Sequence, residues 1–315
     1  MTSETPSSEV PRVRRFAGYD LIARVSIHHG VSTFRAVQVT LGRHVLVSVL
    51  PPDAAKLYVN REHFHRRQEV ASRLRHENVI STIDAGTFKG CRYFVTEDVG
   101  DRTLADELAK HKHLEIARAV SVARDVASAL AYLDGAGVVH RNVAPKSIRL
   151  TDTDVVKLAG FDLAKDQRPG GHETWIEHDG ETAFYLAPEF LGGEKGIDVR
   201  ADVYSLGCVL YHMLTGHAPF AAKSAAVVLE SHATKVPTDP RELREGLSPA
   251  LVGVLDRCLR KKREHRYAKA DDLAKDLDAV RTGRAPSRVP PEGALWPPPA
   301  TRTGPVGLIP RLRRE

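Results

Sequence analysis

The chain has 315 residues, of which 42% are hydrophobic and 27% charged, an ordinary composition for a soluble globular protein with a sizeable core. Its formal net charge of +6 comes from scattered basic residues, which argues against nucleic-acid binding. No segment approaches the roughly 20 apolar residues of a membrane-spanning helix, and the polar N-terminus lacks the apolar segment of a signal peptide. We therefore expect a cytoplasmic protein without a membrane span.

Cysteine and histidine spacing gives no sign of a metal site. Cys91, Cys208 and Cys258 lie far apart, so neither a C-x-x-C pair nor a disulfide framework is indicated. Pairs such as His63 and His65 are two residues apart, which places them on different faces of a helix. We interpret them as surface residues.

The first third of the chain is predicted to form a small β-rich unit. Residues 1–15 are polar and are expected to be a disordered lead-in. One helix is predicted over about residues 61–74. Five segments alternate or cluster β-branched and aromatic residues between turns, and are predicted to be strands: residues 19–25, 33–39, 44–50, 79–88 and 91–98. Residues 16–100 are therefore predicted to be an antiparallel N-lobe.

The remainder of the chain has a helical pattern. Residues 201–216 are apolar nearly all round, which predicts a helix buried inside a large lobe. Further helices are predicted over residues 104–110, 114–137, 225–233, 249–259 and 270–280. We therefore expect an α+β protein with a larger helical C-lobe over residues 101–282. Residues 283–315 are rich in proline and arginine and are predicted to be a disordered tail.

Motifs spread over about residues 19–282 resemble those of the bacterial eukaryotic-like Ser/Thr protein kinases. Ala187-Pro188-Glu189 resembles the end of a kinase activation loop, and Asp202 opens DVYSLG, similar to a helix of that family. The resemblance implies a bilobal kinase fold with a set of architectural residues, in which Arg266 pairs with Glu189. That set comprises His140, Arg141, Phe161, Glu189, Asp202 and Arg266.

The catalytic loop keeps the frame of the kinase motif and changes the residues that react. Asn142 replaces the Asp that accepts the substrate proton, and an amide cannot act as a base. Ala144 and Ser147 replace the Lys and the magnesium-holding Asn of the family. Gly160 stands at the position of the D-F-G Asp, and Asp162 follows two residues later. A role for Asp162 as a metal ligand would require a rebuilt loop.

The N-lobe is altered at matching positions. Ser48 replaces the phosphate-contacting Lys and Arg67 its partner Glu, so the ion pair of the family cannot form. The glycine positions that let backbone approach the phosphates hold Ser26, His28 and Val31. The resemblance also places two larger residues around the adenine, Leu46 and Arg149.

Taken together, these substitutions predict a degenerate kinase, or pseudokinase. The chain is expected not to be an enzyme, to bind neither ATP nor magnesium, and to act as a binding, scaffold or allosteric regulatory module. Two alternatives remain open: a nucleotide sensor without catalysis, or a phosphotransferase with relocated groups. The latter would use Asp162 for metal, and for phosphate Arg24, Arg35 or Lys146.

The expected partners are proteins. One candidate is a genuine kinase that phosphorylates Thr174 or Thr182 close to Arg141. Another is a protein with an aromatic groove that recognises the proline-rich segment 283–315.

Overall fold

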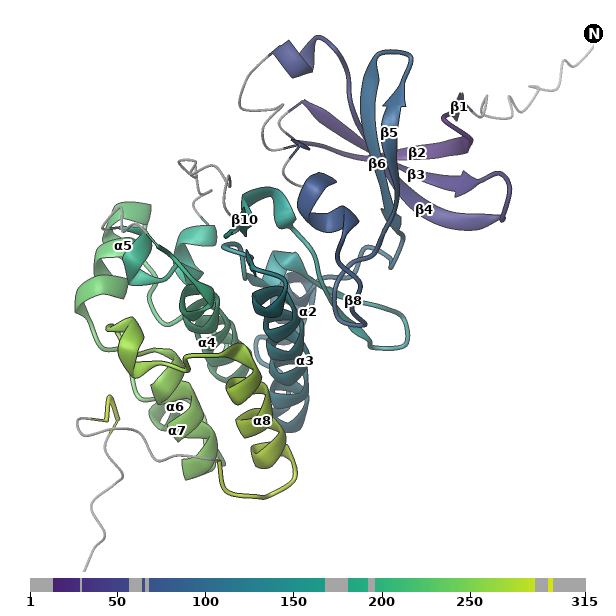
Figure 1. Ribbon diagram of the computed structural model, residues 1–315. Coiled ribbons are helices and arrows are strands. Elements are labelled where there is room, and N and C mark those ends of the chain that lie inside the picture. Colours follow the sequence, from purple (N-terminus) through teal and green to yellow (C-terminus); the bar gives the residue numbers. More distant parts are fainter. Residues whose placement is uncertain are drawn as a thin grey trace, which may run out of the picture.

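The computed structural model describes residues 14–28, 30–56, 64–65, 68–167, 181–191, 196–286 and 294–296. Two lobes lie one above the other, a curled β-sheet and a larger bundle of helices (Figure 1). The predicted bilobal α+β arrangement, an antiparallel β-rich lobe and a larger helical lobe, is therefore confirmed.

The N-lobe sheet is antiparallel, with the strand order β1-β2-β3-β4-β6-β5. Alternating residues of β4, among them Val45 and Val47, are fully buried against Ala36 and Val95, which explains why these β-branched runs form strands. The strands are β1 (Arg14–Phe16), β2 (Tyr19–His28), β3 (Val31–Gln38), β4 (Arg43–Leu50), β5 (Thr82–Phe88) and β6 (Cys91–Glu97).

Strand β1 begins within the range that was expected to be a disordered lead-in. Arg15 pairs with Asp20 of β2 at 2.9 Å between Nε and Oδ1, and Phe16 packs edge-on against Phe88 and Tyr93. This aromatic contact to distant residues orders a segment whose own composition is polar.

The connection between β4 and β5 begins with the 3-10 turn Ala54–Lys56 and includes the helical residues 64–65 and 68–72. Phe64 is buried against Phe94, with ring centroids 5.2 Å apart. Arg73, directly after this helix, donates to Asp166 of the C-lobe at 2.8 Å and so ties the two lobes together. Arg67 lies outside the described residues.

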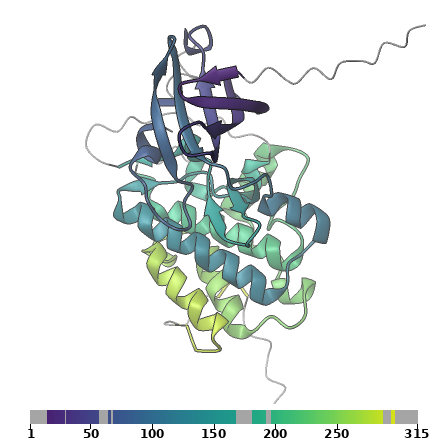
Figure 2. The same cartoon turned by 90° about the vertical axis from the view of Figure 1, so that its right-hand side faces the viewer.

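The C-lobe is built around α3 (Ile116–Gly135) and α4 (Val199–Thr215), with α3 and α8 (Ala270–Arg281) side by side (Figure 2). The other helices are α2 (Leu104–His111), α5 (Ala225–Thr234), α6 (Pro240–Leu243) and α7 (Pro249–Cys258). Short strands β7 (Val138–Val139), β8 (Ile148–Leu150), β9 (Val156–Leu158) and β10 (Lys165–Asp166) carry the loops that face the N-lobe.

Helix α4 is buried along almost its whole length, as its uniformly apolar sequence predicts. A Cβ at Gly207 would lie 2.6 Å from Cβ of Cys258, so only glycine allows α4 and α7 to approach this closely. Cys208 and Cys258 are both free and fully buried here, in agreement with their interpretation as core residues.

Leu295 and Trp296, in the range expected to be a disordered tail, pack on the C-lobe. The Trp296 ring stacks on Tyr211 with centroids 6.3 Å apart, and its Nε1 donates to the carbonyl of Pro237 at 2.9 Å. The N–H of Leu295 donates to the carboxylate of Asp256 at 2.5 Å. Within the described residues, no helix is long and apolar enough to cross a membrane.

Candidate active site

A buried aspartate shapes the catalytic loop. Asp202 on α4 accepts hydrogen bonds from the backbone N–H of His140 at 2.7 Å and of Arg141 at 2.8 Å. Arg141 takes a left-handed φ of 64°, which these two bonds stabilise. The His140 ring accepts from the N–H of Asn142 at Nδ1 and contacts the carbonyl of Ala159 at Nε2, 2.9 Å away. The architectural residues therefore hold the loop in one conformation.

The side chains at the positions where kinases have their reactive groups bond to nearby backbone. Ser147 Oγ donates to the carbonyl of Ala144 at 2.8 Å and accepts from its N–H at 3.0 Å. The Asn142 amide reaches the carbonyl of Gly160 at 3.5 Å. A Cβ at Gly160 would lie 3.2 Å from Cβ of Ser147, and φ there is +82°. Larger residues at position 160 would therefore press on the catalytic loop.

Ser48, at the position of the phosphate-contacting lysine, is a buried part of the sheet. Its Oγ lies 3.1 Å from Oγ1 of Thr33 on β3, and the residue is 2% exposed. Leu46 pairs in register with Thr96 of β6 and Arg35 of β3. In place of the lysine that the family has at this position, a pair of hydroxyl groups joins β3 and β4.

Arg35, predicted from the sequence as a possible phosphate contact, instead joins β3 to the segment that follows β6. Arg35 on β3 donates through Nε to Asp98 at 2.7 Å and through Nη2 to Asp101 at 2.8 Å. Arg149 on β8 donates to the carbonyl of Asp101 at 3.2 Å. The Arg149 guanidinium, which the resemblance placed near the adenine, thus has the backbone carbonyl of Asp101 as a partner.

The loop that should cover the phosphates is a short hairpin. Strand β2 continues to His28 and β3 begins at Val31, with the two residues paired across the turn. Ser26 is exposed and pairs in register with Thr33. The side chain of His28 lies outside what the structure describes. Gly30, at φ +72°, provides the turn itself.

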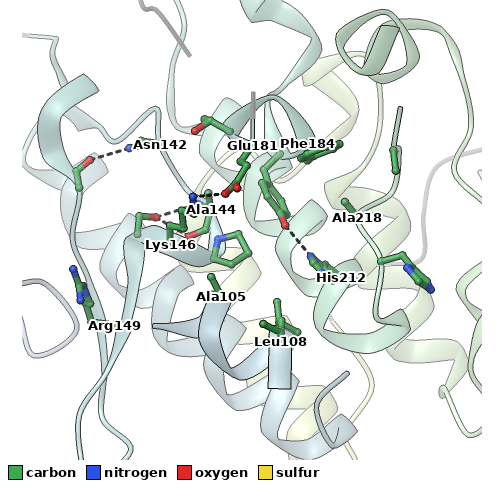
Figure 3. Close-up of a pocket in the computed structure, with 18 of the residues that line it drawn as sticks. Ala105, Leu108, Asn142, Ala144, Lys146, Arg149, Glu181, Phe184, His212 and Ala218 are labelled. Carbon is green, nitrogen blue, oxygen red and sulfur yellow. Dashed lines mark hydrogen bonds and ion pairs between the residues drawn. The ribbon is translucent and has the colours of Figure 1, made fainter. Parts of the chain in front are cut away.

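A cavity of about 750 Å³ opens beside the catalytic loop and extends along the C-lobe (Figure 3). Asn142 and Arg149 lie at one end, and His212 and Ala218 at the other, with the Lys146–Glu181 ion pair between them. The cavity is of the size that holds small molecules or short peptide segments. Sequence reasoning had found only its catalytic-loop end, because the other walls come from α2, α4 and residues 181–185.

The end of the activation segment is firmly anchored. Glu189 and Arg266 form a bidentate pair with N–O distances of 2.7 and 2.9 Å, both side chains being buried. Thr182 lines the cavity, whereas Thr174 lies outside the described residues. The pairing that the resemblance implied for Arg266 is thus present in the structure.

The residues at the usual metal and phosphate positions do not fit those ligands. Ser147 is engaged with its own loop, position 160 has no carboxylate, and Ser48 has no charge. Among the described residues, no cluster of three or more His, Cys, Asp or Glu side chains could hold a metal ion. The backbone of Asp162 belongs to the 3-10 turn Phe161–Leu163, but its side chain lies outside what the structure describes.

Comparison with known proteins identifies the family to which the chain belongs. Residues 30–277 match the sequence pattern that defines the family described as "Protein kinase domain". A probable serine/threonine-protein kinase of Clostridium acetobutylicum is 30% identical over 84% of this chain. The serine/threonine-protein kinases PknB of Mycobacterium leprae and Mycobacterium tuberculosis are 33% and 35% identical over 80% and 78% of it. The chain spans 40%, 41% and 40% of these relatives, respectively.

These comparisons contradict two expectations, that the chain is not an enzyme and that it uses neither ATP nor magnesium. The similar proteins bear the names of serine/threonine-protein kinases, and kinases transfer a phosphoryl group from ATP with the help of magnesium. The error lay in reading the loss of individual side chains as the loss of the reaction. The substitutions remove the side chains that usually bind nucleotide and metal at those positions. Other side chains of the chain remain available for these contacts.

Proposed function

This chain belongs to the protein kinase family, and we propose that it is a Ser/Thr protein kinase-type phosphotransferase whose nucleotide and metal contacts are relocated from their usual positions. The observation that carries the proposal is the identity of 30–35% to named serine/threonine-protein kinases over about four-fifths of the chain. Its substrates would be protein hydroxyl groups.

The intact frame of the active site supports this proposal. Asp202 positions the catalytic loop, and the Glu189–Arg266 pair holds the segment that follows the activation loop. Phosphoryl transfer relies on positioning and electrostatics more than on covalent help from the protein, so a preserved frame is a large part of what the reaction needs. The open cavity beside Asn142 gives a substrate access to that frame.

The relocated groups are fewer than the sequence suggested. The carboxylates of Asp98 and Asp101 engage the guanidinium of Arg35, which makes it a poor phosphate ligand. Lys146 lies in the cavity, two residues beyond Ala144. Asp162 is the carboxylate nearest in sequence to the altered D-F-G position and is our candidate for the metal-dependent step. Because Asn142 cannot accept a proton, we expect a turnover rate on the order of 10²–10⁴-fold lower than that of kinases with a general base.

Transfer of label from [γ-³³P]ATP tests the proposal. The purified chain is incubated with magnesium or manganese and a mixture of protein substrates, and the reaction is repeated with Asp162→Ala. Asp152→Ala, a change in the exposed loop between β8 and β9, is the matched control. We expect incorporation with the wild type and with Asp152→Ala, and its loss with Asp162→Ala.

Two results would count against the proposal. Label transfer that survives Asp162→Ala would remove this residue from the reaction. The absence of transfer with either metal, combined with protein capture that needs no nucleotide, would favour a non-catalytic scaffold.

A further inference from the structure

We propose that the cavity beside the catalytic loop binds an acidic peptide segment, with Lys146 and Arg149 as the groups that recognise its carboxylates. The inference deepens the proposed function, because it assigns a substrate class to the same site. It is carried by the charge of the described lining residues and by how those charges are paired.

Among the described residues that line the cavity, cationic side chains outnumber carboxylates. The lining includes two cationic side chains, Lys146 and Arg149, and a single carboxylate, Glu181. Lys146 and Glu181 form an ion pair with each other, and both side chains are exposed, at 61% and 65%. Arg149 is bound through one nitrogen to a neutral carbonyl. Among the described lining residues, an incoming carboxylate would therefore meet two cations and one acid.

The far end of the cavity adds neutral polar groups rather than a negative charge. The Tyr185 hydroxyl and Nδ1 of His212 are joined by a hydrogen bond of 2.8 Å, and the two rings stack 10° from parallel. Burial lowers the pKa of His212 to about 4, so the ring is neutral at pH 7. A neutral imidazole paired with a hydroxyl gives this wall polar groups without a negative charge, so it offers no counterion to a basic residue.

An apolar surface runs below these polar groups. Ala105 and Leu108 of α2 lie under the Lys146–Glu181 pair in Figure 3, and Ala218 lies at the His212 end. Small side chains along one wall leave room for an extended backbone, and cations along the other select acidic side chains. A peptide fits both features better than a compact anion, which would use only one end.

Peptide binding without nucleotide tests this inference separately from phosphoryl transfer. Three fluorescein-labelled peptides of equal length carry one central serine flanked by Asp and Glu, by Lys and Arg, or by Ala and Gly. Fluorescence anisotropy gives their dissociation constants at low and at physiological ionic strength. We expect the acidic peptide to bind most tightly, and to weaken most as salt is added.

Three variants locate the recognition. Lys146→Glu is expected to weaken the acidic peptide at least about threefold, the size of an exposed ion pair. Lys275→Glu is the matched control, since Lys275 is 69% exposed and also pairs with one carboxylate, that of Asp271, outside the cavity. Glu181→Gln is expected to tighten the acidic peptide by a similar factor, because it removes the carboxylate of the described lining that repels the peptide.

The outcomes separate this inference from the proposed function. Equal or tighter binding of the basic peptide, or the same affinity in Lys146→Glu and Lys275→Glu, would overturn it. An acidic preference without phosphoryl transfer would overturn the proposed function and leave this inference standing. Phosphoryl transfer to peptides without any preference for the acidic one would overturn this inference and leave the proposed function standing.

Discussion

The guanidinium of Arg266 donates to both oxygens of the Glu189 carboxylate, 77 residues away in sequence. Its remaining N–H groups donate to the backbone carbonyls of Arg260, Lys261 and Arg200. All five donors of this buried side chain are thus satisfied. The pair fixes the end of the activation segment to the helical C-lobe.

Removing one partner of this pair should be strongly destabilising. Glu189→Gln leaves the Arg266 charge buried without its counterion, at an expected cost of about 3–5 kcal/mol in the free energy of unfolding. Urea denaturation measures this cost. Asp271→Asn, which breaks the exposed pair with Lys275, is the control and should change stability by less than about 1 kcal/mol. Equal effects of the two substitutions would contradict the structural role of Glu189.

Ser48 is expected to matter for packing and not for nucleotide binding. Ser48→Ala removes its bond to Thr33 and should cost about 1 kcal/mol of stability. The thermal shift that ATP with magnesium produces should be the same in the variant as in the wild type. A smaller shift in Ser48→Ala would mean that this hydroxyl contacts the nucleotide.

Two buried histidines predict a loss of stability in acid. Burial lowers the pKa of both His212 and His232 to about 4, below the usual value near 6.5. The unfolded chain therefore binds more protons between these values, and stability falls as the pH drops from about 6.5 to 4. Each fully titrating group contributes up to about 1.4 kcal/mol per pH unit.

A variant isolates the contribution of His232. Its Nδ1 and the Tyr204 hydroxyl are joined by a hydrogen bond of 2.9 Å, and Lys261 donates to its carbonyl. His232→Gln keeps a polar group and removes the titration. Melting temperatures measured across this pH range should fall less steeply in the variant than in the wild type, and parallel curves would contradict a neutral buried His232.

Trp296 should anchor the segment after α8 to the C-lobe. In Trp175→Phe, Trp296 is the sole tryptophan, and its burial predicts blue-shifted emission that moves red on unfolding. Trp296→Ala should lower the free energy of unfolding by about 3–5 kcal/mol, as for other buried aromatic residues. Emission typical of water in the folded Trp175→Phe protein would show that the ring is not docked.

The helices could be predicted from sequence because their signals are local. The expected range 104–110 became α2, whose start is fixed by a capping box between Thr103 and Asp106. Gly216 ends α4 in a left-handed conformation, at the end of the apolar run that predicted it. Strand β1 was missed because two of its three residues are arginines.

Contacts between distant residues could not be predicted in this way. Arg35 meets Asp98 across 63 residues, and Trp296 meets Pro237 across 59, with no motif to mark either pair. The assignment of the substituted kinase positions stays a prediction, and the conclusion drawn from them, that the chain is not an enzyme, is contradicted by the named kinases to which it is similar. A motif states which groups usually act and leaves open which others can replace them.

The measurement that bears most directly on the central claim is the phosphate balance of the reaction. The purified chain is incubated with ATP, magnesium and an acidic serine peptide, and ADP and phosphopeptide are quantified together. A phosphotransferase predicts slow formation of both products in equal amounts, above a blank without protein. If neither ADP nor phosphopeptide exceeds the blank with magnesium or manganese, the chain does not perform the reaction proposed for it.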